Sequence, residues 1–139
     1  MIALTRNLVY FAIIFLIGAI IFRFGLSTFI EMRSYHLVWI IAGLYFIFNF
    51  AIGWFFGKRD YEHLPLYDVG FRFHFTTYLL FNTVSIAWFL LGFNAHVEKI
   101  GIVYITAIIW GVFLLIHFIF FFIAQKQSIK GISKDEIFE

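Results

Sequence analysis

The chain has no cysteine, one proline and little charge, since only 13% of its 139 residues are Asp, Glu, Lys or Arg. The absence of cysteine excludes disulfides, thiolate metal sites and dithiol redox chemistry within this chain. A net charge of +2 is too small to indicate nucleic-acid binding, and the sequence contains no glycine-rich phosphate loop. The single proline, Pro65, lies in a polar stretch and prevents a helix from continuing through it.

Apolar residues dominate the composition. They make up 63% of the chain, with 22 phenylalanines among them, and the mean hydropathy is +0.97. A soluble domain of this size could not bury so much apolar surface, so the composition predicts an integral membrane protein. Four apolar runs approach the length of about 20 residues that a helix needs to cross a bilayer. These runs cover approximately residues 8–30, 37–56, 73–91 and 101–124.

These four runs define the expected fold. Backbone groups in hydrocarbon must form their hydrogen bonds within their own segment, so each run should be a helix. We therefore expect an all-α chain, an integral membrane four-helix bundle in which residues 1–139 form one domain. Residues 125–139 should form a short cytoplasmic tail.

Basic residues predict the orientation, because cytoplasmic loops carry an excess of Lys and Arg. One side of the membrane would hold seven of them: Arg6, Lys58, Arg59, Arg72, Lys126, Lys130 and Lys134. The other side would hold three: Arg23, Arg33 and Lys99. This bias predicts that both termini are cytoplasmic. Arg23 lies late in the first run, and we expect its side chain to extend toward the membrane surface and Glu31.

The third apolar run carries a polar stripe. His74, Tyr78, Asn82 and Ser85 follow one another at steps of four, four and three residues, which places them on one side of a helix. An Asn side chain without partners in hydrocarbon would cost several kcal/mol. We therefore expect this stripe to face protein and not lipid.

Depth within the bilayer suggests what the stripe contacts. A rise of about 1.5 Å per residue from Arg72 places Tyr78 roughly 9 Å deep and Asn82 roughly 15 Å deep. The same reasoning places both Asn49 and His117 roughly 12 Å deep. We expect these four side chains to form one layer, with a contact between Asn82 and His117.

Trp110 precedes His117 by seven residues and lies on the same helix face, so it should join this layer by packing over Ser85.

Two interpretations of the layer stay open. Polar side chains can join membrane helices, at about 0.6 kcal/mol for each hydrogen bond. Alternatively, the layer forms a buried binding site for a quinone, a lipid headgroup or another ligand.

Cofactor, metal and catalytic sites are not expected. His74 and His117 differ in depth by roughly 9 Å, which argues against a haem held between them. The acidic and histidine residues of the stretch 60–74 match no metal-binding motif. No acidic residue lies within an apolar run, which argues against a coupled transporter. No catalytic constellation is present either, so we expect a protein that is not an enzyme.

Two pairs of small residues allow close helix packing. Gly53 and Gly57 form a G-x-x-x-G pair near the end of the second run, and Ala107 and Gly111 form a similar pair in the fourth. Such pairs let helix backbones approach closely. Packing within the chain and self-association are both compatible with them.

The second half resembles a known family. The segments "FRFHFTTYLLFN" and "WGVFLLIH", followed by a basic tail, are similar to the two-transmembrane domain family. This family comprises helical hairpins of bacterial, often Bacteroidetes-type, membrane proteins. The resemblance covers residues 70–139, and its matching positions are His74, Tyr78, Asn82, Trp110, Gly111 and His117. It implies a hairpin architecture in the inner membrane and a signalling or partner-binding context, but no reaction. This sequence departs from the family by adding two further apolar runs.

The first half can be aligned with the second at an offset of 68 residues, which matches Tyr10 with Tyr78, Gly43 with Gly111 and Asn49 with His117. The chain could therefore consist of two tandem hairpins.

We expect a non-enzymatic membrane subunit that contacts lipids and acts by assembly or signalling, as a homo-oligomer or in a larger complex. The alternative is a ligand-binding or redox-anchor bundle for a quinone, lipid or haem. A pore-forming effector fits less well, because no run suggests a polar lumen.

Overall fold

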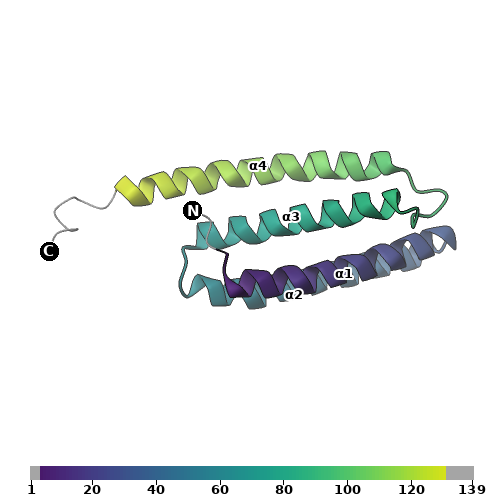
Figure 1. The fold of residues 1–139 in the computed structure, drawn as a ribbon, viewed down its shortest axis with the longest axis horizontal. Helices are drawn as coiled ribbons and strands as arrows, with labels where there is room; N and C mark the ends of the chain where they lie inside the picture. The colour runs from purple at the N-terminus through teal and green to yellow at the C-terminus, as the bar shows by residue number, and fades with distance from the viewer. Residues whose placement is uncertain (1–3, 131–139) are drawn as a thin grey trace.

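The computed structural model describes residues 4–130 and, within that range, contains four helices and no strand (Figure 1). The helices are α1 (Arg6–Glu31), α2 (Tyr35–Tyr61), α3 (Leu66–Leu90) and α4 (Ile100–Lys130). The expected all-α fold is confirmed. Three helices, α1, α2 and α4, are long and apolar enough to cross a membrane. The remaining helix, α3, is the one that carries the polar stripe.

The helices are longer than the apolar runs that predicted them. α3 begins at Leu66, not near residue 73, and α4 continues to Lys130, not to 124. The first residues of the expected tail are therefore helical, whereas residues 131–139, with Lys134, lie outside the described part of the chain.

Two antiparallel hairpins, α1–α2 and α3–α4, form an open bundle. α3 is its central helix, because it packs against α1, α2 and α4. α4, by contrast, packs against α3 and against no other described helix. Figure 1 shows α4 along one side of α3, with α1 and α2 on the other side. Much of the surface of α4 therefore contacts no other part of the described chain.

A stripe of α1 forms the centre of the core. Leu8, Phe11, Phe15 and Ala19 recur every three or four residues, which places them on one helix face, and all four are buried. Phe11 meets Phe73 of α3 with the ring centroids 4.7 Å apart. This packing fixes α1 against the half of α3 in which the polar stripe begins.

Polar contacts join α1 to α2 at the end where α1 begins. Thr5 caps α1 by accepting a hydrogen bond from the backbone N–H of Leu8. Its hydroxyl also donates to Asp60 Oδ2 at 2.5 Å, and Asn7 Nδ2 donates to Asp60 Oδ1 at 2.8 Å. Asp60 is only 5% exposed. The polar stretch before Pro65 is thus largely helix, and its aspartate fixes the end of α2 to the start of α1.

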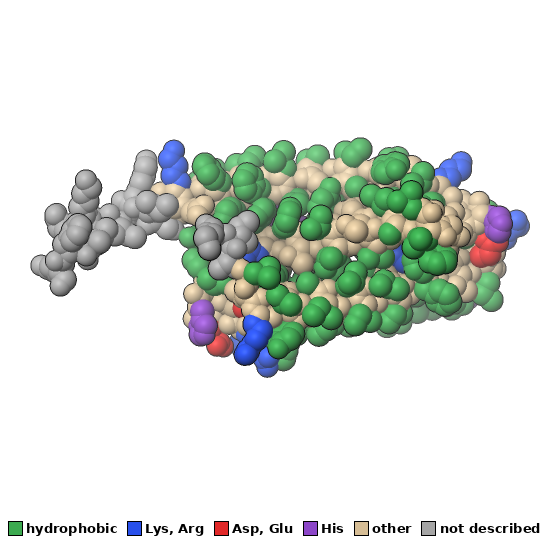
Figure 2. Space-filling view, in the orientation of Figure 1, with side chains coloured by type: hydrophobic (Ala, Val, Ile, Leu, Met, Phe, Trp, Pro, Cys, Tyr) green, Lys and Arg blue, Asp and Glu red, His purple; other side chains and the backbone are tan. Residues whose placement is uncertain are grey.

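The surface separates into an apolar middle and charged ends. Figure 2 shows hydrophobic side chains along the length of the molecule and most of the Lys, Arg, Asp and Glu at its two ends. On α2, Trp39 is 78% exposed and Phe46 is 71% exposed. This distribution is compatible with a membrane protein, because an apolar band between polar ends matches the profile of a bilayer.

Candidate functional site: a histidine pair between α3 and α4

Two histidines from different helices meet between α3 and α4. His74 Nδ1 of α3 lies 3.3 Å from His117 Nδ1 of α4, within hydrogen-bond distance. The indole Nε1 of Trp110, two helical turns before His117, donates to His74 Nε2 at 2.7 Å. All three side chains are half-buried. They form a continuous chain of hydrogen bonds across the α3–α4 interface.

The donors and acceptors in this chain determine where the protons lie. An indole nitrogen can only donate, so His74 Nε2 must accept, and a neutral His74 carries its proton on Nδ1. His74 Nδ1 then donates to His117 Nδ1, which leaves the proton of a neutral His117 on its Nε2. His117 Nε2 lies 3.6 Å from the position that a Cβ atom on Gly70 would occupy. The ring of His117 therefore lies close to the backbone of α3 at Gly70.

Tyr78 extends the interface by one turn of α3. Its hydroxyl donates to the backbone oxygen of Ala107 at 3.2 Å, and its ring meets that of Trp110 edge-on with centroids 5.8 Å apart. A Cβ atom on Gly111 would lie 3.1 Å from the Tyr78 hydroxyl. The small residues Ala107 and Gly111 thus pack within the chain, where they accommodate Tyr78.

The rest of the expected layer is arranged differently. Asn82 does not contact His117; its Nδ2 donates to the backbone oxygen of Tyr78 at 2.8 Å, one turn back in the same helix. Asn49 lies on α2, which does not pack against α4. The expected Asn82–His117 contact is therefore wrong. Among the described residues, the side-chain oxygens of Asn49, Asn82 and Ser85 are buried without a hydrogen-bond partner.

The register of α3 against α4 explains the difference. Counting depth from Arg72 and from the end of the fourth apolar run treats these two edges as level. In the structure, Tyr67, in the first turn of α3, already meets Phe121 of α4, with ring centroids 5.9 Å apart. This register places His74 level with His117. It also places Trp110 next to His74, and not over Ser85 as expected.

The depth argument against haem is consequently wrong, because the two histidines are at the same level. A different observation bears on the question. The nitrogens of His74 and His117 bond directly to each other, and the other nitrogen of His74 is engaged by Trp110. In this arrangement no iron and porphyrin plane fits between the two rings. Among residues 4–130, no group of three or more histidines and acidic residues could hold a metal ion.

A second polar cluster lies at the opposite end of the bundle and was not expected. Arg23 is 5% exposed, and its guanidinium pairs with Glu98 of the α3–α4 loop at 3.2 Å. Ser27, one turn further along α1, donates to the same carboxylate at 3.2 Å. The expectation that Arg23 extends toward Glu31 is wrong, since Glu31 instead accepts from His96. The signal in the sequence for this pair is an arginine late in the first apolar run and a glutamate in the loop after the third run, which are expected on the same side of the bundle.

The glycine pair of α2 faces open space. A Cβ atom on Gly53 would meet nothing within 4 Å, and one on Gly57 would meet only Val69, at 3.8 Å. The two glycines line a groove of about 510 Å³ between α2 and α3, whose rim includes Trp54 and Lys58. Unlike the Ala107–Gly111 pair, this pair is mostly open: among the described residues, only Gly57 approaches a neighbouring helix, at Val69 of α3.

Residues matched between the two halves differ in their surroundings. A Cβ atom on Gly43 would meet nothing within 4 Å, whereas one on its counterpart Gly111 would touch Tyr78. Tyr10 is 49% exposed, whereas Tyr78 bonds to α4. The chain does contain two hairpins, but these matched positions do not play equivalent roles in them.

No protein-family model, curated protein or solved structure matches this chain. The resemblance to the two-transmembrane domain family therefore stays a prediction.

Proposed function

We propose that this chain is a small non-enzymatic membrane subunit that acts by assembly, and that the open glycine face of α2 binds a second copy of the chain. The observation that carries the proposal is the groove of about 510 Å³ at Gly53 and Gly57, where a Cβ atom on Gly53 would meet no described atom within 4 Å and one on Gly57 would meet only Val69. Small residues at a helix surface let a second backbone approach closely, which favours association in a membrane.

The wide apolar surfaces support a membrane setting. Within the described part of α4, the buried apolar side chains are Val103 and Leu114, while most other large apolar residues of this helix are exposed. Exposing such an apolar surface to water would be unfavourable, whereas lipid tails or neighbouring helices can cover it. The resemblance of residues 70–139 to membrane hairpins with partner-binding or signalling contexts supports the same function.

The native mass of the purified chain in a mild detergent tests this function. We expect a mass of two copies or more for the unchanged chain, and a monomer for Gly53→Leu, whose side chain would fill the groove. Ala51→Leu is the matched control. Ala51 is exposed and lies two residues away, about 200° around the helix, so this variant should keep the assembly. A monomeric unchanged chain, or equal masses for both variants, would contradict the proposal.

We further propose that the protein lies in the bacterial inner membrane with both termini cytoplasmic. The start of α1 and the end of α4 lie at the same end of the bundle (Figure 1), and Arg6, Lys58, Arg59 and Lys126 belong to that end. A reporter fused after Glu139 should report a cytoplasmic location. A periplasmic signal would overturn this orientation.

A second candidate function, quinone binding, is favoured by the histidine pair. The proton on His117 Nε2 is the free donor at the end of the hydrogen-bond chain, and a quinone carbonyl could accept it. Solvent extraction of the purified chain should then yield a quinone that is lost in a His117→Leu variant. An extract without quinone, or equal amounts from both proteins, would exclude this candidate.

A further inference from the structure

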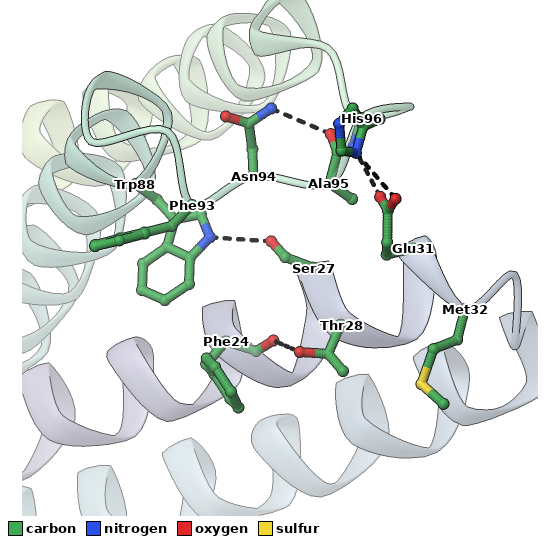
Figure 3. Close-up of a pocket in the computed structure, with 10 residues that line it drawn as sticks. All are labelled: Phe24, Ser27, Thr28, Glu31, Met32, Trp88, Phe93, Asn94, Ala95 and His96. Carbon is green, nitrogen blue, oxygen red and sulfur yellow. Dashed lines mark hydrogen bonds and ion pairs between the residues drawn. The ribbon is translucent and has the colours of Figure 1, made fainter.

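A pocket of about 620 Å³ lies between the end of α1 and the loop that follows α3 (Figure 3). We call it the outer pocket. Three aromatic side chains line it, Phe24, Trp88 and Phe93, together with the carboxylate of Glu31. Figure 3 shows Trp88 and Phe93 together on one side and Glu31 on the other, with Ser27 between them. It is separate from the histidine pair and from the glycine groove.

Hydrogen bonds hold the aromatic wall in place. The indole Nε1 of Trp88 donates to Ser27 Oγ at 3.0 Å, and Ser27 donates in turn to Glu98, which is paired with the buried Arg23. The rings of Trp88 and Phe93 are tilted by 59° with centroids 5.2 Å apart. Since the indole is fixed from within the protein, its position does not depend on a ligand.

The charge of the outer pocket favours a cation. Among the described residues, its lining includes Glu31 but neither lysine nor arginine; Arg33, which does not line it, is near enough to act electrostatically on Glu31. Glu31 accepts hydrogen bonds from the backbone nitrogen and the ring Nδ1 of His96, both at 2.9 Å, and its side chain is half exposed. The helices α1 and α3 both end here, and the last carbonyls of a helix carry partial negative charge.

We propose that the outer pocket binds a quaternary ammonium group, such as the trimethylammonium of choline. Such a cation cannot donate hydrogen bonds, so it is recognised by aromatic faces and by a nearby carboxylate, and tryptophan is the strongest aromatic partner. Trp88, Phe93, Phe24 and Glu31 supply both elements. The cation could belong to a free small molecule or to a lipid headgroup.

Calorimetric titration of the full chain in a maltoside detergent tests this site. Choline is the ligand, and 3,3-dimethylbutanol, its uncharged isostere, is the control compound. We expect choline to bind about tenfold more tightly than the isostere, and Trp88→Leu to weaken choline binding about tenfold. Trp39→Leu is the matched control variant, because Trp39 is 78% exposed on α2 and does not line the pocket. It should bind choline as the unchanged chain does.

A second variant protects the test against misfolding of Trp88→Leu. Glu31→Gln keeps the size of the side chain but removes its charge, and should weaken choline binding several-fold while leaving the isostere unaffected. Equal binding of choline and its isostere, or unchanged choline affinity in both variants, would overturn the proposal.

Vesicles separate the two sources of the cation. If the ligand is a lipid headgroup, phosphatidylcholine should copurify in preference to phosphatidylglycerol, and choline should displace it. If the ligand is a free molecule, choline should bind equally well in phosphatidylglycerol vesicles and no lipid should be enriched. Failure to bind choline in either kind of vesicle would contradict the site, whatever the oligomeric state of the chain.

Discussion

Removing the two histidines separately should destabilise the α3–α4 interface to different extents. His117→Leu removes one hydrogen bond and leaves His74 Nδ1 without an acceptor. His74→Leu removes two, because Trp110 Nε1 also loses its acceptor. A hydrogen bond between membrane helices contributes about 0.6 kcal/mol on average and about 1.7 kcal/mol at most. We therefore expect losses of about 1 kcal/mol for His117→Leu and about 2 kcal/mol for His74→Leu.

The double variant measures the coupling free energy between the two histidines. Once one histidine is gone, the other has no bond left to lose across the pair, so the double variant should cost less than the sum by about 1 kcal/mol. Reversible unfolding in mixed micelles, followed by circular dichroism, measures the three free energies of unfolding. His36→Leu is the control: His36 is exposed at the opposite end and its loss should change stability by less than about 0.5 kcal/mol. Strict additivity of the two histidine variants would refute the reasoning.

Neighbouring contacts lead to three further predictions. Asn82→Leu should be additive with His117→Leu within about 0.5 kcal/mol, because Asn82 bonds to its own helix; a larger coupling in the same unfolding assay would contradict this. Gly111→Ala should lower the free energy of unfolding by about 1–3 kcal/mol, because its Cβ atom would lie 3.1 Å from the Tyr78 hydroxyl. Gly43→Ala is the control, because its Cβ atom would meet no described atom within 4 Å and should not destabilise the protein. Equal thermal stabilities of the two variants would be inconsistent with this packing. Arg23→Leu should cost about 3–5 kcal/mol of stability, because it leaves the buried carboxylate of Glu98 without its ion-pair partner. Adding Glu98→Gln should restore part of this stability. No recovery in the double variant would count against the ion pair.

The sequence predicted the four helices but not where they end. Apolar runs mark the part of a helix that lies in an apolar environment, and the structure confirms a helix over each run. The helix ends depend on polar contacts between segments, which hydropathy does not register. Asp60 stays helical because Thr5 and Asn7 bind its carboxylate, and these residues are more than 50 positions away in the chain.

The candidate site could be predicted in its composition but not in its pairing. His117, Tyr78 and Trp110 lie between α3 and α4, and a short loop between two helices predicts that these helices are antiparallel neighbours. Their partners depend on the register, and α3 begins about two turns earlier, and α4 ends almost two turns later, than the apolar runs that set the expected register. Asn82 shows a second reason: an Asn in a helix can bond to the carbonyl one turn back, so a polar residue need not seek the next helix.

The open face of α2 could not be predicted either. A G-x-x-x-G pair has the same sequence signature whether it packs within its own chain or against another. Only the arrangement of the helices shows that Ala107 and Gly111 meet Tyr78, whereas Gly53 and Gly57 border a groove.

Cysteine crosslinking in native membranes tests most directly whether α2 binds a second copy. The chain has no cysteine of its own, so a single substitution gives an unambiguous product. Gly53→Cys should form a crosslinked dimer on mild oxidation, while Ala51→Cys, exposed on the opposite side of α2, should stay monomeric. Equal crosslinking of the two variants, or none at Gly53, would contradict the proposed assembly through the glycine face.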